Sequence, residues 1–273
     1  MSRQTYATCF KALFISPIAL LGFGLPSLGQ PLMPPQRTAL QYNPPNRGAP
    51  GYTRNAGSRT GPCGDLTAVQ PTQTNWGETL ERHPTFGIYL AESAVNLTFE
   101  LREESSQEIL HQVTFDQIEG PGISLYTLPD TAPILEPNQF YRWQVSLDCE
   151  QFNTPNVQYR GVKRAGGTIF RRLVSEQLQT TLSTAAETEK PSLLAANGLW
   201  YDTVHTLLLQ RLHQPDTERW INDWQNLLIH PMVQLNNLME AAPIECCLAS
   251  SCVEPKSTSP SVSPSDPGTS TLL

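Results

Sequence analysis

Alternation of apolar and polar residues along the middle of the chain limits the fold most strongly. Between positions 141 and 149, large apolar residues occupy every second position and polar residues lie between them. Successive side chains of a strand point to opposite faces, so this spacing predicts a strand with one buried face. Similar alternation recurs at 86–90, 95–101, 109–115, 123–127 and 157–161. Turn-forming clusters separate these runs, which is typical of an antiparallel β-sandwich.

The spacing of apolar residues changes from two to nearly four after Gly166 and Gly167. Thr168 is placed to cap a first helix that carries Ile169 and Phe170 toward the sheet. Asn197 is placed to cap a second helix, and a third begins near Thr217. Apolar stripes along these two helices include Trp200, Val204, Leu207, Leu208, Trp220, Trp224, Leu227 and Leu228. The short connector around Pro215 predicts that the two pack as a hairpin. The expected fold is therefore mainly β with C-terminal α: an antiparallel β-sandwich followed by a helical hairpin appendage.

The first 29 residues have the features of a cleavable signal peptide. Arg3 and Lys11 precede an apolar run over residues 12–25, and small residues follow up to Gly29. The run is shorter than the roughly 20 residues that a bilayer requires. We therefore expect a periplasmic or extracellular product without a membrane span after cleavage.

The remaining chain divides into four parts by composition. Residues 30–61 are rich in Pro, Gly, Asn and Arg and are predicted to form a linker. Residues 62–166 are assigned to the sandwich and residues 167–242 to the helical region. Residues 243–273 contain three cysteines and many Ser and Pro residues, which predicts a disordered tail.

Several short motifs follow one another along the chain. They are Gly57-Ser58-Arg59-Thr60-Gly61-Pro62-Cys63, His83-Pro84-Thr85-Phe86, Tyr141-Arg142-Trp143 and Gly198-Leu199-Trp200-Tyr201-Asp202. Their order resembles an exported cyanobacterial protein family, numbered nine-twenty-eight in the series of domains of unknown function. The resemblance covers about residues 57–230 and implies export and a fold, but no activity.

The net charge and the absence of known catalytic motifs exclude several classes of function. The chain has 18 basic and 25 acidic residues, a net charge of −7, which disfavours nucleic acid as a partner. The sequence has no nucleophile elbow, phosphate loop, dinucleotide fingerprint or zinc-ligand pattern. We therefore assign no catalytic residue, no metal and no cofactor.

Aromatic residues of the second helix are the candidate binding residues. Trp200 lies on the packing stripe, whereas Tyr201 and Asp202 lie off it. Off-stripe positions face solvent, so this pair is predicted to form an exposed binding surface beside Trp200. Asp202 and His205 share a helix face and have the spacing of a metal pair, but two such groups are common on a solvated face.

Cys63 and Cys149 are the predicted disulfide. Cys149 continues the inward series of its strand, and Cys63 stands where the ordered domain is expected to begin. Export makes a disulfide chemically permissible, and a reduced, buried Cys149 is the alternative. The pairing of Cys246, Cys247 and Cys252 stays open.

Three functions fit these observations. The first is a non-catalytic module that binds another envelope or secreted protein, since no catalytic group stands out. The second is binding of a carbohydrate or surface polysaccharide through exposed aromatic residues. The third is an enzyme with a site that sequence patterns do not reveal.

Overall fold

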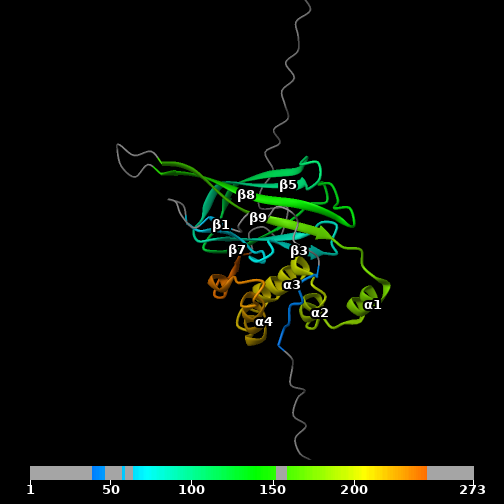
Figure 1. The fold of residues 1–273 in the computed structure, drawn as a ribbon. Coiled ribbons are helices and arrows are strands. Elements are labelled where there is room, and N and C mark those ends of the chain that lie inside the picture. Colours follow the sequence, from blue (N-terminus) through cyan, green and yellow to red (C-terminus); the bar gives the residue numbers. More distant parts are fainter. Residues whose placement is uncertain (1–38, 47–56, 59–63, 152–158, 245–273) are drawn as a thin grey trace, which may run out of the picture. The chain divides into compact units, whose positions relative to one another are not determined.

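The computed structural model describes residues 39–46, 57–58, 64–151 and 159–244. These residues form two five-stranded sheets followed by helices (Figure 1). The predicted signal peptide and almost all of the predicted C-terminal tail lie outside the described residues. No helix among the described residues is long and apolar enough to cross a bilayer.

The first sheet contains the longest strands of the described chain. Its order is β3-β9-β8-β5-β6, with β3 parallel to β9 and all other neighbours antiparallel. The strands are β3 (Trp76–Thr79), β9 (Tyr159–Arg171), β8 (Gln139–Gln151), β5 (Ala94–Glu103) and β6 (Ile109–Ile118).

The second sheet has shorter strands in the order β1-β2-β4-β7-β10. They are β1 (Gly57–Ser58), β2 (Leu66–Ala68), β4 (Thr85–Leu90), β7 (Gly122–Thr127) and β10 (Pro243–Ile244). β10 pairs parallel with β7. All other neighbours in this sheet are antiparallel. Both sheets are therefore mainly antiparallel, as predicted, and each becomes mixed through one short strand that adds in the parallel direction.

Aromatic side chains join the two sheets face to face. The Phe86 ring of β4 lies 5.0 Å from the rings of Phe99 on β5 and Trp143 on β8. Phe99 also lies 4.7 Å from Tyr126 on β7. The alternation in the sequence predicts that these residues point inward. The predicted mainly β fold with C-terminal helices is confirmed.

The last strand extends past the predicted boundary between sandwich and helices. Residues 168–171 pair with both β3 and β8, so the helix predicted to begin at Thr168 is wrong. Ile169 faces the core while Phe170 faces the other side, where it lies 4.6 Å from Phe140. Pairing on both edges of the strand outweighs the local helical spacing. The first helix, α1 (Glu176–Thr184), begins after Ser175, whose side chain accepts a hydrogen bond from Leu178 N.

Three further helices follow α1. They are α2 (Lys190–Ala196), α3 (Trp200–His213) and α4 (Glu218–Leu228), followed by the 3-10 turn η1 (Asn236–Leu238). Asn197 ends α2 rather than capping α3, because its Nδ2 donates to Leu193 O at 2.8 Å. Gly198 has a φ of 75° and separates the two helices; a Cβ there would lie 2.7 Å from Asn43 O.

Helices α3 and α4 contact each other through the predicted stripes. Trp200, Leu207, Leu208, Trp224 and Leu227 are all fully buried. They belong to the same core cluster as the sandwich residues, and residues 39–244 lie in one compact unit. The helices are therefore part of the domain rather than an appendage to it.

The predicted linker also contributes to the core. Leu40 and Tyr42 are 4% and 3% exposed, and the Tyr42 ring lies 5.3 Å from that of Trp200. Asn43 N donates to Ala195 O at 3.0 Å. Assigning all of residues 30–61 to a linker is therefore wrong, because two apolar side chains among the prolines are buried in the domain.

Candidate functional site

The three predicted binding residues lie at the start of α3, and none of them is exposed. Trp200, Tyr201 and Asp202 are 0%, 2% and 8% exposed. The prediction that Tyr201 and Asp202 form a solvent-facing surface is wrong. The first turn of α3 is covered on several sides, by the sandwich interior, by β3 and by Tyr42, so positions off the packing stripe are buried as well.

Trp200 holds α3 against two strands. Its Nε1 donates to Val69 O at 3.0 Å, just beyond β2. A Cβ at Gly77 of β3 would lie 2.6 Å from the Trp200 Cβ, so only glycine permits this approach of helix and strand. The indole is therefore a structural anchor.

The hydroxyl of Tyr201 is hydrogen-bonded inside the core. It accepts a hydrogen bond from Trp143 Nε1 at 2.7 Å and donates to Thr168 O at 3.1 Å. Burial raises the pKa of this phenol well above its ordinary value. Tyr201 thus connects α3 to β8 and β9.

Asp202 connects α3 to the segment that follows β3. Leu80 N lies 3.4 and 3.3 Å from Asp202 Oδ1 and Oδ2 and donates to this carboxylate. Burial, and next the nearby charge of Glu81, raise the pKa of Asp202 to about 7. The position in the first turn of a helix favours the ionised form, but desolvation outweighs it.

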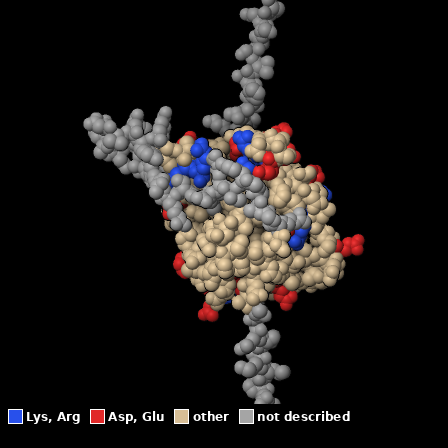
Figure 2. Space-filling model, viewed as in Figure 1, with Lys and Arg blue, Asp and Glu red and all other residues tan. Residues whose placement is uncertain are grey.

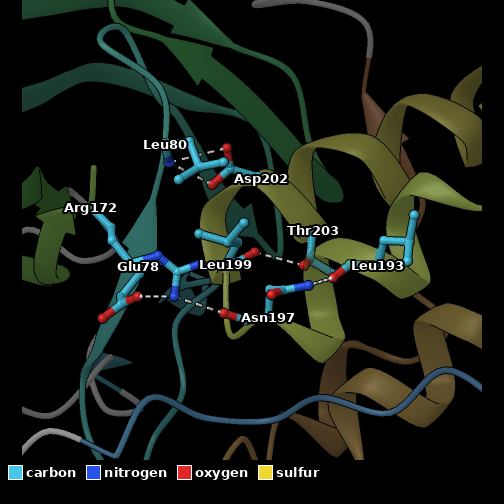
Figure 3. A network of polar contacts seen from close by, with 8 residues as sticks. All are labelled: Glu78, Leu80, Arg172, Leu193, Asn197, Leu199, Asp202 and Thr203. Carbon is cyan, nitrogen blue, oxygen red and sulfur yellow. Dashed lines mark hydrogen bonds and ion pairs between the residues drawn. The ribbon is translucent and has the colours of Figure 1, made fainter. Parts of the chain in front are cut away.

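A second buried carboxylate, Glu78, lies in the same region (Figure 3). Its side chain is 2% exposed and forms an ion pair of 2.9 Å with Arg172 Nη1. The same nitrogen donates to Asn197 O at 3.1 Å, so Arg172 connects β3 to the corner between α2 and α3. We call Glu78, Leu80, Arg172, Asn197 and Asp202 the junction network.

The junction network supports the fold, because its contacts join elements that are distant in sequence. A buried carboxylate with a raised pKa is also the usual mark of a general acid or base, but here Asp202 is hydrogen-bonded to main chain at the base of a helix. Sequence reasoning missed Glu78 and Arg172. β3 is only four residues long, and a lone Glu and Arg 94 positions apart carry no pattern.

A histidine and a cysteine of the two-sheet core have simpler surroundings. His111 lies on β6 with its Nε2 2.7 Å from Tyr126 Oη, and burial lowers its pKa. The described residues contain no group of three His, Cys, Asp or Glu side chains arranged to hold a metal ion. Cys149 is 2% exposed, as its inward register predicts. Cys63 lies outside the described residues, so the disulfide stays a prediction.

The exposed candidate is α1 with the residues on either side of it. We call residues 173–189 the α1 segment. Leu173 and Val174 are 58% and 38% exposed, and α1 itself contains no buried residue. Leu178 and Leu182, one turn apart, form an apolar stripe that is only half buried. Within the described chain α1 makes only sparse contact with other helices and strands, and it lies beyond α2 and apart from α3 and α4 (Figure 1).

Charged side chains are sparse on one face of the molecule. Figure 2 shows that the lower part of this face, over the helices, is mostly uncharged, with Asp and Glu side chains at its rim. The α1 segment contains three glutamates, Glu176, Glu187 and Glu189, and no Lys or Arg. This segment therefore combines exposed apolar side chains with negative charge.

Comparison with protein families gives one match. Residues 49–243 match the family described as Domain of Unknown Function (DUF928). Comparison with curated proteins and with solved structures gives no match. The match spans the sandwich and all four helices, so the junction network and the α1 segment both lie within it.

Proposed function

We propose that this chain, which belongs to the DUF928 family, is a non-catalytic interaction module that binds another envelope or secreted protein through its α1 segment. The observation that carries the proposal is a helix with no buried residue and a line of exposed or half-exposed apolar side chains. Trp200 and Tyr201, the aromatic residues that would have suited carbohydrate, are buried, so we do not extend the proposal to sugars.

The length of α1 favours a partner that stabilises the helix. An isolated helix shorter than about 12–15 residues is marginal in water, and most helical stability in proteins comes from packing of an apolar face. α1 has nine residues, and its apolar face meets little of the described chain. A groove on a partner that receives Leu178 and Leu182 would supply that packing.

The charge of the α1 segment specifies the chemistry of the partner. Glu187 forms an ion pair with Lys190, the residue that follows the segment, so residues 173–190 keep a net charge of −2. This remaining negative charge favours a groove rimmed by basic side chains. We therefore propose an apolar groove with a basic rim on a folded protein. Such contact is expected to weaken as salt rises, because rim charges are screened.

Site-directed photo-crosslinking tests this proposal in the native cells. A photoreactive residue replaces Val174, next to the stripe, in the full tagged chain. The expected result is one crosslinked adduct of defined mass that is lost in the double variant Leu178→Asp, Leu182→Asp. Purification and mass spectrometry of the adduct identify the partner, whose own groove is then mutated at its basic rim.

The matched control is Gln179→Asp, Ser183→Asp, which adds the same two charges one residue further along the same helix, off the stripe. It should retain the adduct. Equal adduct yields from both double variants, or no adduct from the parent protein, would overturn the proposal.

Export is part of the same proposal and rests on the leader sequence. The basic residues Arg3 and Lys11 before the apolar run, and the small residues up to Gly29, support cleavage after position 29. Mass spectrometry of the envelope and medium fractions should find a mature chain that begins at Gln30. An intact N-terminus on cytoplasmic protein would contradict it.

A disulfide between Cys63 and Cys149 also belongs to this proposal. Gly64 O, in the residue next to Cys63, accepts a hydrogen bond from Lys163 Nζ at 2.9 Å, and Lys163 lies opposite Leu147 on β8. This contact brings the backbone next to Cys63 close to the end of β8 that carries Cys149. Peptide mapping without reduction should find the two cysteines linked; Cys63 linked to a C-terminal cysteine would refute the pairing.

A further inference from the structure

The first sheet ends at β6, and no described strand lies on the outer side of β6. β6 has ten residues, whereas the strand at the opposite edge, β3, has four buried residues and contacts α3. The two edge strands of the second sheet, β1 and β10, have two residues each. β6 is therefore the one long edge strand in the described part of the chain.

β6 has few of the usual features that prevent edge pairing. Natural edge strands are commonly short, or carry Lys, Pro or a bulge that blocks another strand. The sequence of β6, ILHQVTFDQI, contains no Lys, Arg, Pro or Gly and a single carboxylate, Asp116. Its pairing with β5 shifts register once, between His111 and Ile109, at the start of the strand. The regular row of main-chain donors and acceptors beyond that point favours addition of another strand.

We propose that β6 pairs antiparallel with β6 of a second copy of this chain and thereby extends the first sheet across a twofold axis. The two faces of β6 indicate that the added strand is a second β6. Phe115 and His111 face inward, where both contact Tyr126, and Gln112 and Thr114 are exposed on the outer face. A second β6 presents the same faces in the same order, so both faces continue across the axis.

A register centred on Thr114 fits the side chains best. Each Thr114 then lies opposite its own copy, Phe115 lies opposite Val113, and Asp116 lies opposite Gln112. Thr–Thr and aromatic–β-branched pairs are favourable across strands, and no carboxylate meets a carboxylate. Thr114 already makes such a pair within the chain, with its Oγ1 3.0 Å from Thr98 Oγ1.

Two cysteine variants of the full chain test the register. Thr114→Cys places two cysteines directly opposite each other, with Cβ atoms about 5 Å apart. Asp116→Cys lies on the same exposed face, but its copies are separated by four residues along the strands, about 13 Å. Mild oxidation should link Thr114→Cys into a dimer, with a peptide joined through the two introduced thiols, and leave Asp116→Cys at the level of the parent protein. Equal linking of both variants would overturn the register.

A charge variant tests the association itself. Light scattering after gel filtration should give twice the monomer mass for the parent protein. Thr114→Lys brings two ammonium groups together and should raise the dimer dissociation constant at least tenfold, whereas Ser146→Lys, on the same face but two strands from the edge, should not. A parent protein that is monomeric at about 100 μM, or equal dissociation constants for the two variants, would refute the proposal.

Discussion

Helices α1 and α3 begin 24 residues apart, and they differ in how far they are buried. α3 carries eight buried residues, including polar ones such as Asp202, and its first turn is hydrogen-bonded to four strands or the residues just beyond them, namely β2, β3, β8 and β9. α1 carries a regular stripe of leucines and no buried residue. An apolar stripe therefore indicates which face of a helix can pack against another surface. It does not indicate whether that surface belongs to this chain.

The largest expected effect is at Trp200. Trp200→Ala removes a fully buried indole, its ring contact with Tyr42 and its hydrogen bond to Val69 O. The free energy of unfolding should fall by about 3–5 kcal/mol. Trp200→Phe, which keeps an aromatic ring but loses the N–H, should cost clearly less in the same denaturant titration. A loss below about 1 kcal/mol for the alanine variant would show that α3 is not anchored by this side chain.

Asp202 should make stability depend on pH. Its folded-state pKa of about 7 lies above the unfolded value near 4, so the folded state binds the proton more tightly. The stability that this proton provides is complete below pH 4 and is lost as pH rises through 7. Asp202→Asn removes that loss, so the variant should gain about 2–3 kcal/mol relative to the parent between pH 5 and pH 8.

The control for this pH experiment is Asp148→Asn, which removes an exposed carboxylate from β8 and changes the net charge equally. Its difference from the parent should stay the same across the pH range. A pH-independent difference for Asp202→Asn as well would mean that the buried carboxylate is ionised throughout and that desolvation does not dominate its pKa.

Tyr201→Phe should have the next largest effect. It removes one oxygen and leaves the buried Trp143 N–H without its acceptor. An orphaned buried donor costs about 1–3 kcal/mol, which urea unfolding would measure. Tyr89→Phe is the control: Tyr89 is half buried, and its hydroxyl has no hydrogen bond within the described part of the chain, so a change below about 0.5 kcal/mol is expected.

The smallest effect is expected in α1. Leu178→Ala and Leu182→Ala should each change the free energy of unfolding by less than about 0.5 kcal/mol, because neither side chain is buried in this chain. Leu207→Ala in α3, at a fully buried leucine, should cost about 2–5 kcal/mol. A comparable loss in both helices would erase the contrast between the two regions.

Hydrogen exchange of backbone amides compares α1 with α3 without any mutation. Amides of α1 should exchange hydrogen for deuterium far faster than those of α3, since local opening of a helix without packing costs almost no free energy. Hydrogen-exchange mass spectrometry of the purified protein measures this directly. Strong protection of α1 in the absence of any partner would contradict the proposed docking role.

Much of the fold was predictable because it rests on local alternation. The alternation correctly predicted the strands at 95–101 and 141–149, and the apolar stripes correctly predicted the helices that contain Trp200 and Trp224. The failures lie where an element depends on distant partners. Residues 168–171 are strand because β3 and β8 flank them, and β3 itself is too short to carry a periodic signal. The candidate site failed for a similar reason, because Tyr201 is covered by strands from distant parts of the chain.

The sequence by itself determined which faces of strands and helices are apolar, because that property depends on spacing alone. It also determined the family, whose motifs run in order along the chain. Only the tertiary structure decided which of these faces are covered. Burial of the first turn of α3, partnership of Glu78 with Arg172, and exposure of α1 and β6 each depend on elements brought together from distant parts of the chain. A side chain's spacing is a local property, whereas its burial depends on what the rest of the fold places against it.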